Sequence, residues 1–207
     1  MKKFFTVVPL QPEGKLDSYL YEAVDNQKLQ LDKKVSFPIL CAIDGYAVSD
    51  EVFQLIAITI QDENAKRNAK ILQKEFDELC EERGYKGEFL CVSIPADDAV
   101  STHIETFQKL IDLVADEDEL FSCMTYGTKP LSEVLRMAIH YAYRLHKNTS
   151  IGCMIYGQIS RPSVDTSTWT GKIYDQTALV HLNEMVGMLA ERGIEQPKEF
   201  LHSIISM

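Results

Sequence analysis

Short apolar runs alternate along the chain with segments whose apolar residues recur at helical spacing. The apolar runs predict strands at residues 4–8, 53–60, 89–94, 120–125 and 151–156. The helical spacings predict helices at residues 64–83, 101–114, 131–145, 178–189 and 197–205. Strands and helices in alternation are typical of a parallel sheet with helices on both faces. The sequence therefore predicts a single α/β domain over residues 1–207, with a Rossmann-like, doubly wound and mainly parallel sheet.

Two stretches depart from this alternation. Residues 15–49 carry a weaker pattern, with one short helix predicted at 16–23 and an irregular segment at 37–39, so we expect an insertion inside the domain. Residues 157–171 are rich in polar and turn-forming residues and predict a loop. After it, residues 178–207 are expected to form C-terminal helices.

The composition narrows the class of protein. Hydrophobic residues make up 45% of the chain and charged residues 25%, which is ordinary for a globular protein. With 21 Lys+Arg against 31 Asp+Glu, the formal charge is -10, which argues against electrostatic binding of long DNA or RNA. Binding of a small anion stays possible, because a few amide groups and one or two cations can hold it. No apolar stretch approaches the roughly 18–20 residues of a membrane helix, so we expect a cytoplasmic protein with no membrane partner.

The cysteines and the known cofactor motifs give little sign of a metal or cofactor. Five cysteines occur singly, with no C-x-x-C pair: Cys41, Cys80, Cys91, Cys123 and Cys153. Cys91, Cys123 and Cys153 lie in apolar runs, so buried, reduced thiols are predicted and a zinc site is not. The glycine-rich phosphate and dinucleotide motifs and the hydrolase G-x-S-x-G motif are missing. The sequence therefore predicts neither a metal nor a bound cofactor.

The segment from residue 123 to 130 reads as a strand that runs through a small turn directly into a helix. Gly127 permits a tight turn, Thr128 or Lys129 can cap the helix, and Pro130 suits its first turn. Such a turn points amide groups at the carboxyl edge of the sheet, where open α/β folds bind ligands, and Lys129 adds a charge. The pattern predicts a phosphate site; the alternative is an ordinary strand-to-helix turn.

Two further strand ends are expected at the same edge. They supply Pro9, Leu10 and Gln11 after the first strand, and Tyr156, Gly157 and Arg161 after a later one. Tyr156 is a candidate for stacking on a base, or else a half-buried aromatic residue of the strand. Arg161 is a candidate for a phosphate contact, or else a solvated arginine of the loop.

Three short motifs follow one another in the second half of the chain. They are Cys123-Met124-Thr125-Tyr126-Gly127-Thr128-Lys129, Ile155-Tyr156-Gly157 and Asp175-Gln176-Thr177. With these motifs in this order, the chain resembles the CRISPR-associated Rossmann fold (CARF) proteins, which sense cyclic oligoadenylates. Their patterns read like D-x-T-H-G with a basic residue, then Y-Y-G, then D-L-T before a helix. Cys123 stands here in place of the Asp, and Tyr126 in place of the His.

The resemblance implies a homodimer that holds one ring of cyclic oligoadenylate across its two-fold axis in type III CRISPR antiviral signalling. Thr125, Gly127, Thr128 and Lys129 would supply the turn, the hydroxyl groups and the cation at that site. CARF proteins usually carry an effector such as a HEPN ribonuclease, and the chain has no room for one. The resemblance thus implies a stand-alone sensor with a possible separate effector protein.

Two alternatives stay open for the same site. One is a metal-independent ring nuclease that cleaves the ligand through its own 2′-OH, with Thr128 as a positioning group and Lys129 stabilising the developing charge. The other is a regulatory dimer that binds no ligand.

Overall fold

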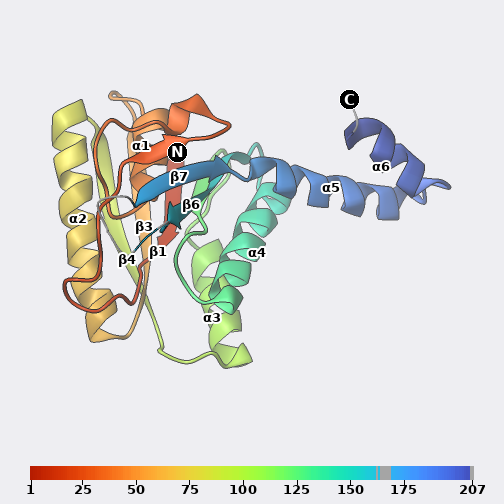
Figure 1. Ribbon diagram of the computed structural model, residues 1–207. Helices are drawn as coiled ribbons and strands as arrows, with labels where there is room; N and C mark the ends of the chain where they lie inside the picture. Colours follow the sequence, from red (N-terminus) through yellow and green to blue (C-terminus); the bar gives the residue numbers. More distant parts are fainter. Residues whose placement is uncertain (162, 164–168, 206–207) are drawn as a thin grey trace.

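The computed structural model describes residues 1–161, 163 and 169–205 and shows an α/β fold built on one seven-stranded sheet (Figure 1). The strands are β1 (Lys2–Val7), β2 (Tyr21–Ala23), β3 (Val52–Ile60), β4 (Lys86–Ile94), β5 (Glu119–Cys123), β6 (Ser150–Ser160) and β7 (Thr170–Asp175). The helices are α1 (Ile39–Tyr46), α2 (Glu63–Arg83), α3 (Val100–Ile111), α4 (Lys129–Leu145), α5 (Thr177–Arg192) and α6 (Pro197–Ile205), with a 3-10 turn at Gln27–Leu29.

The strand order places a topological switch point between β1 and β5. The order across the sheet is β2-β7-β6-β5-β1-β3-β4. After β1 the chain first forms β2 at the far edge of the sheet. It then adds β3 and β4 on one side of β1, and crosses to the other side for β5 and β6; the pairs β1–β3, β3–β4, β1–β5 and β5–β6 are parallel. This order confirms the predicted Rossmann-like fold. Ligands of such sheets bind beyond the carboxyl ends of the strands, where the order reverses.

Each face of the sheet is covered by its own layer of helices, α1 and α2 on one side and α3 and α4 on the other (Figure 1). Neighbouring residues of β1 point to opposite faces, so Phe4 belongs to the core under α1 and α2, and Phe5 to the core under α3 and α4. Phe4 stacks on Phe121 of β5 at 4.5 Å between ring centroids. Both faces of the central strands are therefore buried, which explains their continuous apolar runs.

The stretch 15–49 differs from the prediction. The expected helix at 16–23 is wrong, because Tyr21–Ala23 forms the edge strand β2, paired in parallel with β7. The segment at 37–39 is irregular at Phe37 and Pro38, as predicted, and Ile39 begins α1. Phe37 is nevertheless fully buried. The apolar residues of this stretch cover one face of the sheet, and they do so through short elements whose spacing shows no clear period.

The predicted loop at 157–171 is also wrong in part. β6 continues through Gly157 to Ser160, and β7 begins at Thr170. These two strands form the antiparallel pair of the sheet, with Gly157 opposite Ile173. Polar residues alternate along this hairpin because it lies near the edge of the sheet, and that alternation resembles a loop in sequence. Residues 162 and 164–168 lie outside the described part of the chain.

The cysteine prediction holds at the centre of the sheet and fails at its edge. Cys41, Cys123 and Cys153 are buried free thiols, as predicted for the last two. Cys91 is exposed, because it lies on the outermost strand, β4, where helix cover is incomplete. Within the described ranges no group of three potential metal-binding side chains is found, and no helix is long and apolar enough to cross a membrane.

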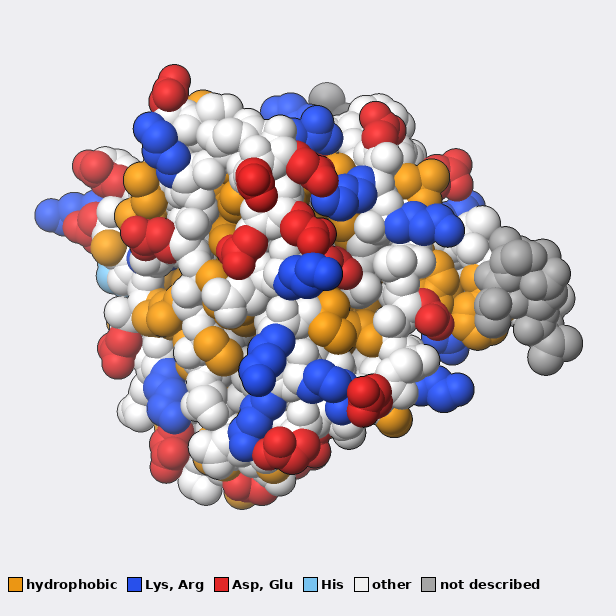
Figure 2. Space-filling view, turned by 90° about the vertical axis from the view of Figure 1, so that its left-hand side faces the viewer, with side chains coloured by type: hydrophobic (Ala, Val, Ile, Leu, Met, Phe, Trp, Pro, Cys, Tyr) orange, Lys and Arg blue, Asp and Glu red, His pale blue; other side chains and the backbone are white. Residues whose placement is uncertain are grey.

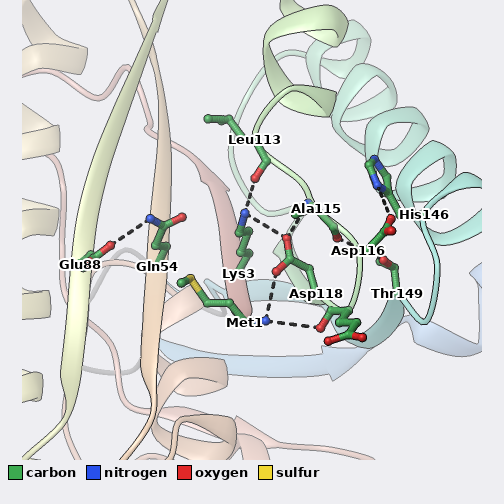
Figure 3. Close-up of polar contacts among 11 residues, drawn as sticks. Met1, Lys3, Gln54, Glu88, Leu113, Ala115, Asp116, Asp118, His146 and Thr149 are labelled. Carbon is green, nitrogen blue, oxygen red and sulfur yellow. Dashed lines mark hydrogen bonds and ion pairs between the residues drawn. The ribbon is translucent and has the colours of Figure 1, made fainter.

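A buried carboxylate lies at the edge of the sheet where β1 and β5 begin (Figure 3). Asp118 is 3% exposed and accepts a hydrogen bond from the Ala115 amide at 2.8 Å. It also pairs with Lys3 at 2.9 Å and with the amino group of Met1 at 3.1 Å. Lys3 is itself buried and donates further to the Leu113 carbonyl. The start of β1 is thus held to β5 at the edge opposite the switch point.

The last two helices lead away from the sheet. α5 is fixed to α4 by the buried carboxylate of Glu184, which pairs with Arg144 at 2.7 Å and with His140. Beyond this contact α5 projects from the domain and carries α6 at its far end (Figure 1). α6 has no buried residue, and Phe200 and Ile205 are exposed.

Candidate ligand-binding site

A cavity of about 320 Å³ lies at the switch point, between the residues that follow β1 and β5. Its lining consists of Val8, Pro9, Leu10, Gln11, Ile60, Thr125, Tyr126, Gly127 and Thr128. Six of the ten residues proposed as ligand contacts meet here, although they are more than a hundred positions apart in the chain: Pro9, Leu10, Gln11, Thr125, Gly127 and Thr128. The parallel arrangement of β1 and β5 brings these two strand ends together.

Helix α2 holds the segment after β1 in place. The side-chain amide of Asn68 donates to the Pro9 carbonyl at 2.9 Å and to the Gln11 carbonyl at 3.0 Å. The guanidinium of Arg67 donates to the same Gln11 carbonyl at 3.0 Å. Sequence reasoning missed both residues. Asn68 could have been found from the sequence, because it is a polar residue on the apolar helix face formed by Ala65 and Leu72.

Gln11 lines the cavity, and its side-chain oxygen is a buried acceptor without a hydrogen-bond partner among the described residues. A buried acceptor without a partner costs about 1–3 kcal/mol, so a ligand N–H that reaches it gains more than an ordinary hydrogen bond. The cavity is therefore suited to a ligand that carries a donor at this point.

The turn after β5 has the geometry that its sequence predicts. Gly127 has φ +108°, a conformation that residues with a Cβ adopt rarely, and a Cβ here would also lie 3.1 Å from Val7. Thr128 is the N-cap of α4, with its hydroxyl oxygen accepting from the Leu131 amide at 3.4 Å. Lys129 begins α4 and is exposed just outside the lining.

A carboxylate lies at the rim of the cavity. The Thr128 hydroxyl donates to Asp98 at 3.4 Å. Asp98 is 64% exposed and lies 3.7 Å from His103, a distance too long for a hydrogen bond. Because like charges repel, Asp98 weakens the binding of any phosphate near Thr128. The charge of Lys129 and the first backbone amides of α4 instead favour the binding of a phosphate.

Thr125 joins the turn after β5 to β6. Its hydroxyl oxygen accepts from the Gly157 amide of β6 at 2.7 Å and from the Cys123 thiol at 3.2 Å. A Cβ on Gly157 would lie 2.6 Å from Pro38, the residue that precedes α1. Gly157 is buried and outside the cavity lining. These contacts give both residues a role in packing.

The two positions that depart from the CARF patterns are neutral; Cys123 is buried and Tyr126 half-buried. Burial raises the pKa of the Cys123 thiol and of the Tyr126 phenol, so both keep their protons at ordinary pH. The Tyr126 hydroxyl donates to the Ser36 carbonyl at 2.8 Å, and its ring meets Phe37 edge-on. Tyr126 thus anchors the stretch before α1 beneath the cavity.

The structure does not bring Tyr156 and Arg161 into this cavity. Tyr156 is 43% exposed and lines a separate groove of about 490 Å³ between α4 and α5, together with Arg136. Arg161 lies over the ring of Trp169 at 4.8 Å. Trp169 borders a third cavity, of about 800 Å³, beside β2 and β7. Within one chain, the ten proposed contacts are therefore divided among different surfaces.

The Asp175-Gln176-Thr177 motif is engaged in hydrogen bonds within the fold. One oxygen of Asp175 accepts from the Thr177 amide at 2.9 Å and from its hydroxyl at 2.5 Å, and the other from Asn26 at 2.7 Å. The Thr177 hydroxyl oxygen accepts in turn from the Met154 amide at 2.8 Å. The motif thereby ties α5 to β6 and to the turn after β2.

No family model matches the chain, and the curated proteins contain no match to it.

Proposed function

We propose that the switch-point cavity binds cyclic oligoadenylate and that the protein is a stand-alone, cytoplasmic homodimer of the CARF type. The observation that carries the proposal is the buried side-chain oxygen of Gln11, a residue that lines the cavity at the switch point; this oxygen has no partner in the part of the chain that the structure describes. Adenine carries an exocyclic amino group, a donor of the kind that this oxygen can accept. The signalling role in type III CRISPR defence, and a separate effector protein, rest on the sequence resemblance.

The size of the cavity supports a dimer. About 320 Å³ is at the lower end of the roughly 300–1,000 Å³ of small-molecule sites, so it accommodates a part of a ring of adenylates. A ring with two-fold symmetry matches an isologous pair of such cavities, one from each chain. A dimer in solution would have twice the 23.5 kDa mass of the chain, which light scattering measures directly.

The phosphates of the ligand are assigned to the start of α4. The amides that follow Gly127 and the exposed charge of Lys129 lie beside the cavity that takes the base. Tyr156 and Arg161 remain proposed contacts for a part of the ring that extends beyond one cavity.

Calorimetric titration with cyclic tetra- and hexa-adenylate tests this function. We expect binding with one ring per two chains. Gln11→Leu should weaken the affinity about tenfold, the cost of one buried hydrogen bond. Gln108→Leu, a change of the same kind on the exposed surface of α3, should leave the affinity unchanged. No heat of binding with either ring at micromolar protein would refute the proposal.

The two alternatives, a ring nuclease and a regulatory dimer without a ligand, predict other results than a sensor when the protein is incubated with the ring. A ring nuclease converts labelled ring to linear product in EDTA, and Lys129→Ala slows this conversion. A sensor leaves the ring intact, and Lys129→Ala weakens binding. A regulatory dimer without a ligand shows neither effect. The Thr128 hydroxyl already caps α4 and contacts Asp98, so the structure gives a nuclease role for Thr128 no separate support.

A further inference from the structure

A second cavity, next to the switch point, has a basic wall. It measures about 510 Å³ and lies between the first half of α2 and the ends of β3 and β4. Its walls include Lys66, Arg67 and Lys70 of α2 and, on the other side, Phe89, Cys91 and Ser93 of β4. We call it the α2–β4 cleft. Three cations and one carboxylate line it, although the chain as a whole carries -10.

The cations share one surface because they belong to neighbouring turns of α2. Lys66 and Lys70 are four residues apart and Arg67 lies between them, so all three lie along one side of the helix. Figure 2 shows several Lys and Arg side chains in the lower part of the α2 side of the molecule, where α2 begins. A local excess of positive charge on an acidic protein attracts small anions.

The contacts within the cleft leave much of this charge available. Glu63 pairs with Lys66 at 2.7 Å, but both side chains are more than half exposed, and such pairs are weak. Arg67 uses one nitrogen for Gln11 and Asn64. Asp62 already accepts from two amides at the start of α2, so the amides at this helix end are occupied and the side chains supply the positive charge of the cleft.

We propose that the α2–β4 cleft binds the phosphate chain of a small ligand, either a nucleoside triphosphate or an inorganic polyphosphate. Lys66, Arg67 and Lys70 face the phosphates, and Phe89, Cys91 and Ser93 of β4 form the opposite wall. Arg67 also bonds to Gln11, and Ile60 lines both cavities. A ligand in the cleft therefore lies next to the switch-point cavity.

The reactivity of the Cys91 thiol can report ligand binding in the cleft. Cys91 is exposed, lines the cleft, and its sulfur lies 3.0 Å from the Thr59 hydroxyl. A bound phosphate chain should shield this thiol from N-ethylmaleimide, a neutral reagent that the cations do not attract. Cys80 is half-buried on α2 outside the cleft and serves as an internal reference.

The experiment measures the labelling rate of Cys91 by peptide mass spectrometry, in EDTA, with tripolyphosphate, with ATP, or with NaCl of the same ionic strength. In the wild type, we expect either phosphate compound to slow Cys91 labelling at least fivefold and to leave Cys80 unchanged. Stronger protection by ATP would assign the cleft to nucleotides, and equal protection to the phosphate chain alone.

Two variants with the same change of charge provide the control. Lys66→Gln/Lys70→Gln should abolish the protection. Lys74→Gln/Lys109→Gln, which removes two exposed lysines outside the cleft, should retain it. Absence of protection in the wild type, or equal protection in both variants, would overturn the inference. Ring binding at Gln11 is measured separately by calorimetry, so failure of one proposal does not imply failure of the other.

Discussion

The hydroxyl oxygen of Thr125 accepts a hydrogen bond from the amide of Gly157 at 2.7 Å, and this contact joins the turn after β5 to β6. Both residues belong to motifs that resemble those of nucleotide sensors, yet here they hold the sheet together beneath the cavity. The switch-point site thus depends on packing as well as on residues that face a ligand.

Thr125→Val should therefore lower the free energy of unfolding. Valine keeps the shape of the side chain but leaves the Gly157 amide without its acceptor, which costs about 1–3 kcal/mol. Urea denaturation measures the loss. Thr170→Val, at an exposed position of β7, is the matched control and should change stability by less than about 0.5 kcal/mol. Equal losses for the two variants would contradict the role given to Thr125.

Gly157→Ala should destabilise the protein mainly through its contact with Pro38, although the new Cβ would also lie 3.2 Å from the Thr125 hydroxyl oxygen. A Cβ at this position would lie 2.6 Å from Cγ of Pro38 and 3.0 Å from its Cβ, so the backbone has to move. Overpacking of this kind costs about 1–3 kcal/mol. Pro38→Ala removes the closer atom, so the double variant should lose less stability than the sum of the two single variants. Strict additivity would show that the contact with Pro38 is not the cause.

Asp118 should make stability depend on pH in acid. Burial by itself raises the pKa of this carboxyl, but hydrogen bonds from Ala115, Lys3 and the amino terminus outweigh burial and hold the pKa below its usual value. A carboxyl of this kind contributes stability above the unfolded-state pKa of about 3.9 and loses it as pH falls through the lower folded-state pKa.

The test compares urea unfolding of the wild type and Asp118→Asn from neutral to acid pH. We expect the variant to be less stable by about 3 kcal/mol near neutrality, because Lys3 is left buried without its partner. The difference should shrink as pH falls below about 4. A difference that stays constant over the whole range would exclude a pKa shift of Asp118 as its source.

Asp98 should oppose ligand binding. Its carboxylate contacts Thr128 at the rim of the cavity, so Asp98→Asn removes a negative charge close to the proposed phosphate position. We expect the affinity for cyclic tetra-adenylate to rise about two- to fivefold, in keeping with one screened surface charge. Asp50→Asn, an exposed change before β3 at the opposite edge, should have no effect. Weaker binding by Asp98→Asn would place the phosphates elsewhere.

Much of the central fold is predictable from the sequence because β3, β4 and β5 are each an apolar run followed by a turn and a helix. The same rule predicts that Gln11 and Gly127 lie at the same edge of the sheet, beyond the carboxyl ends of the strands. This rule fails for two kinds of element. Tyr21–Ala23 is too short to show a period, and the β6–β7 hairpin has polar residues at alternating positions, which resemble a loop in sequence. It also fails for Arg67 and Asn68, because their contacts with the Gln11 carbonyl depend on how α2 packs against the loop after β1.

The most direct test of the proposed function is an NMR titration of the isotopically labelled protein with cyclic tetra-adenylate. The account predicts that the largest shifts occur at the side-chain amide of Gln11 and at the backbone amides of Gly127 and Thr128, with saturation at one ring per two chains. Shifts confined to other surfaces, or no shifts with millimolar ring, would contradict ligand binding at the switch-point cavity.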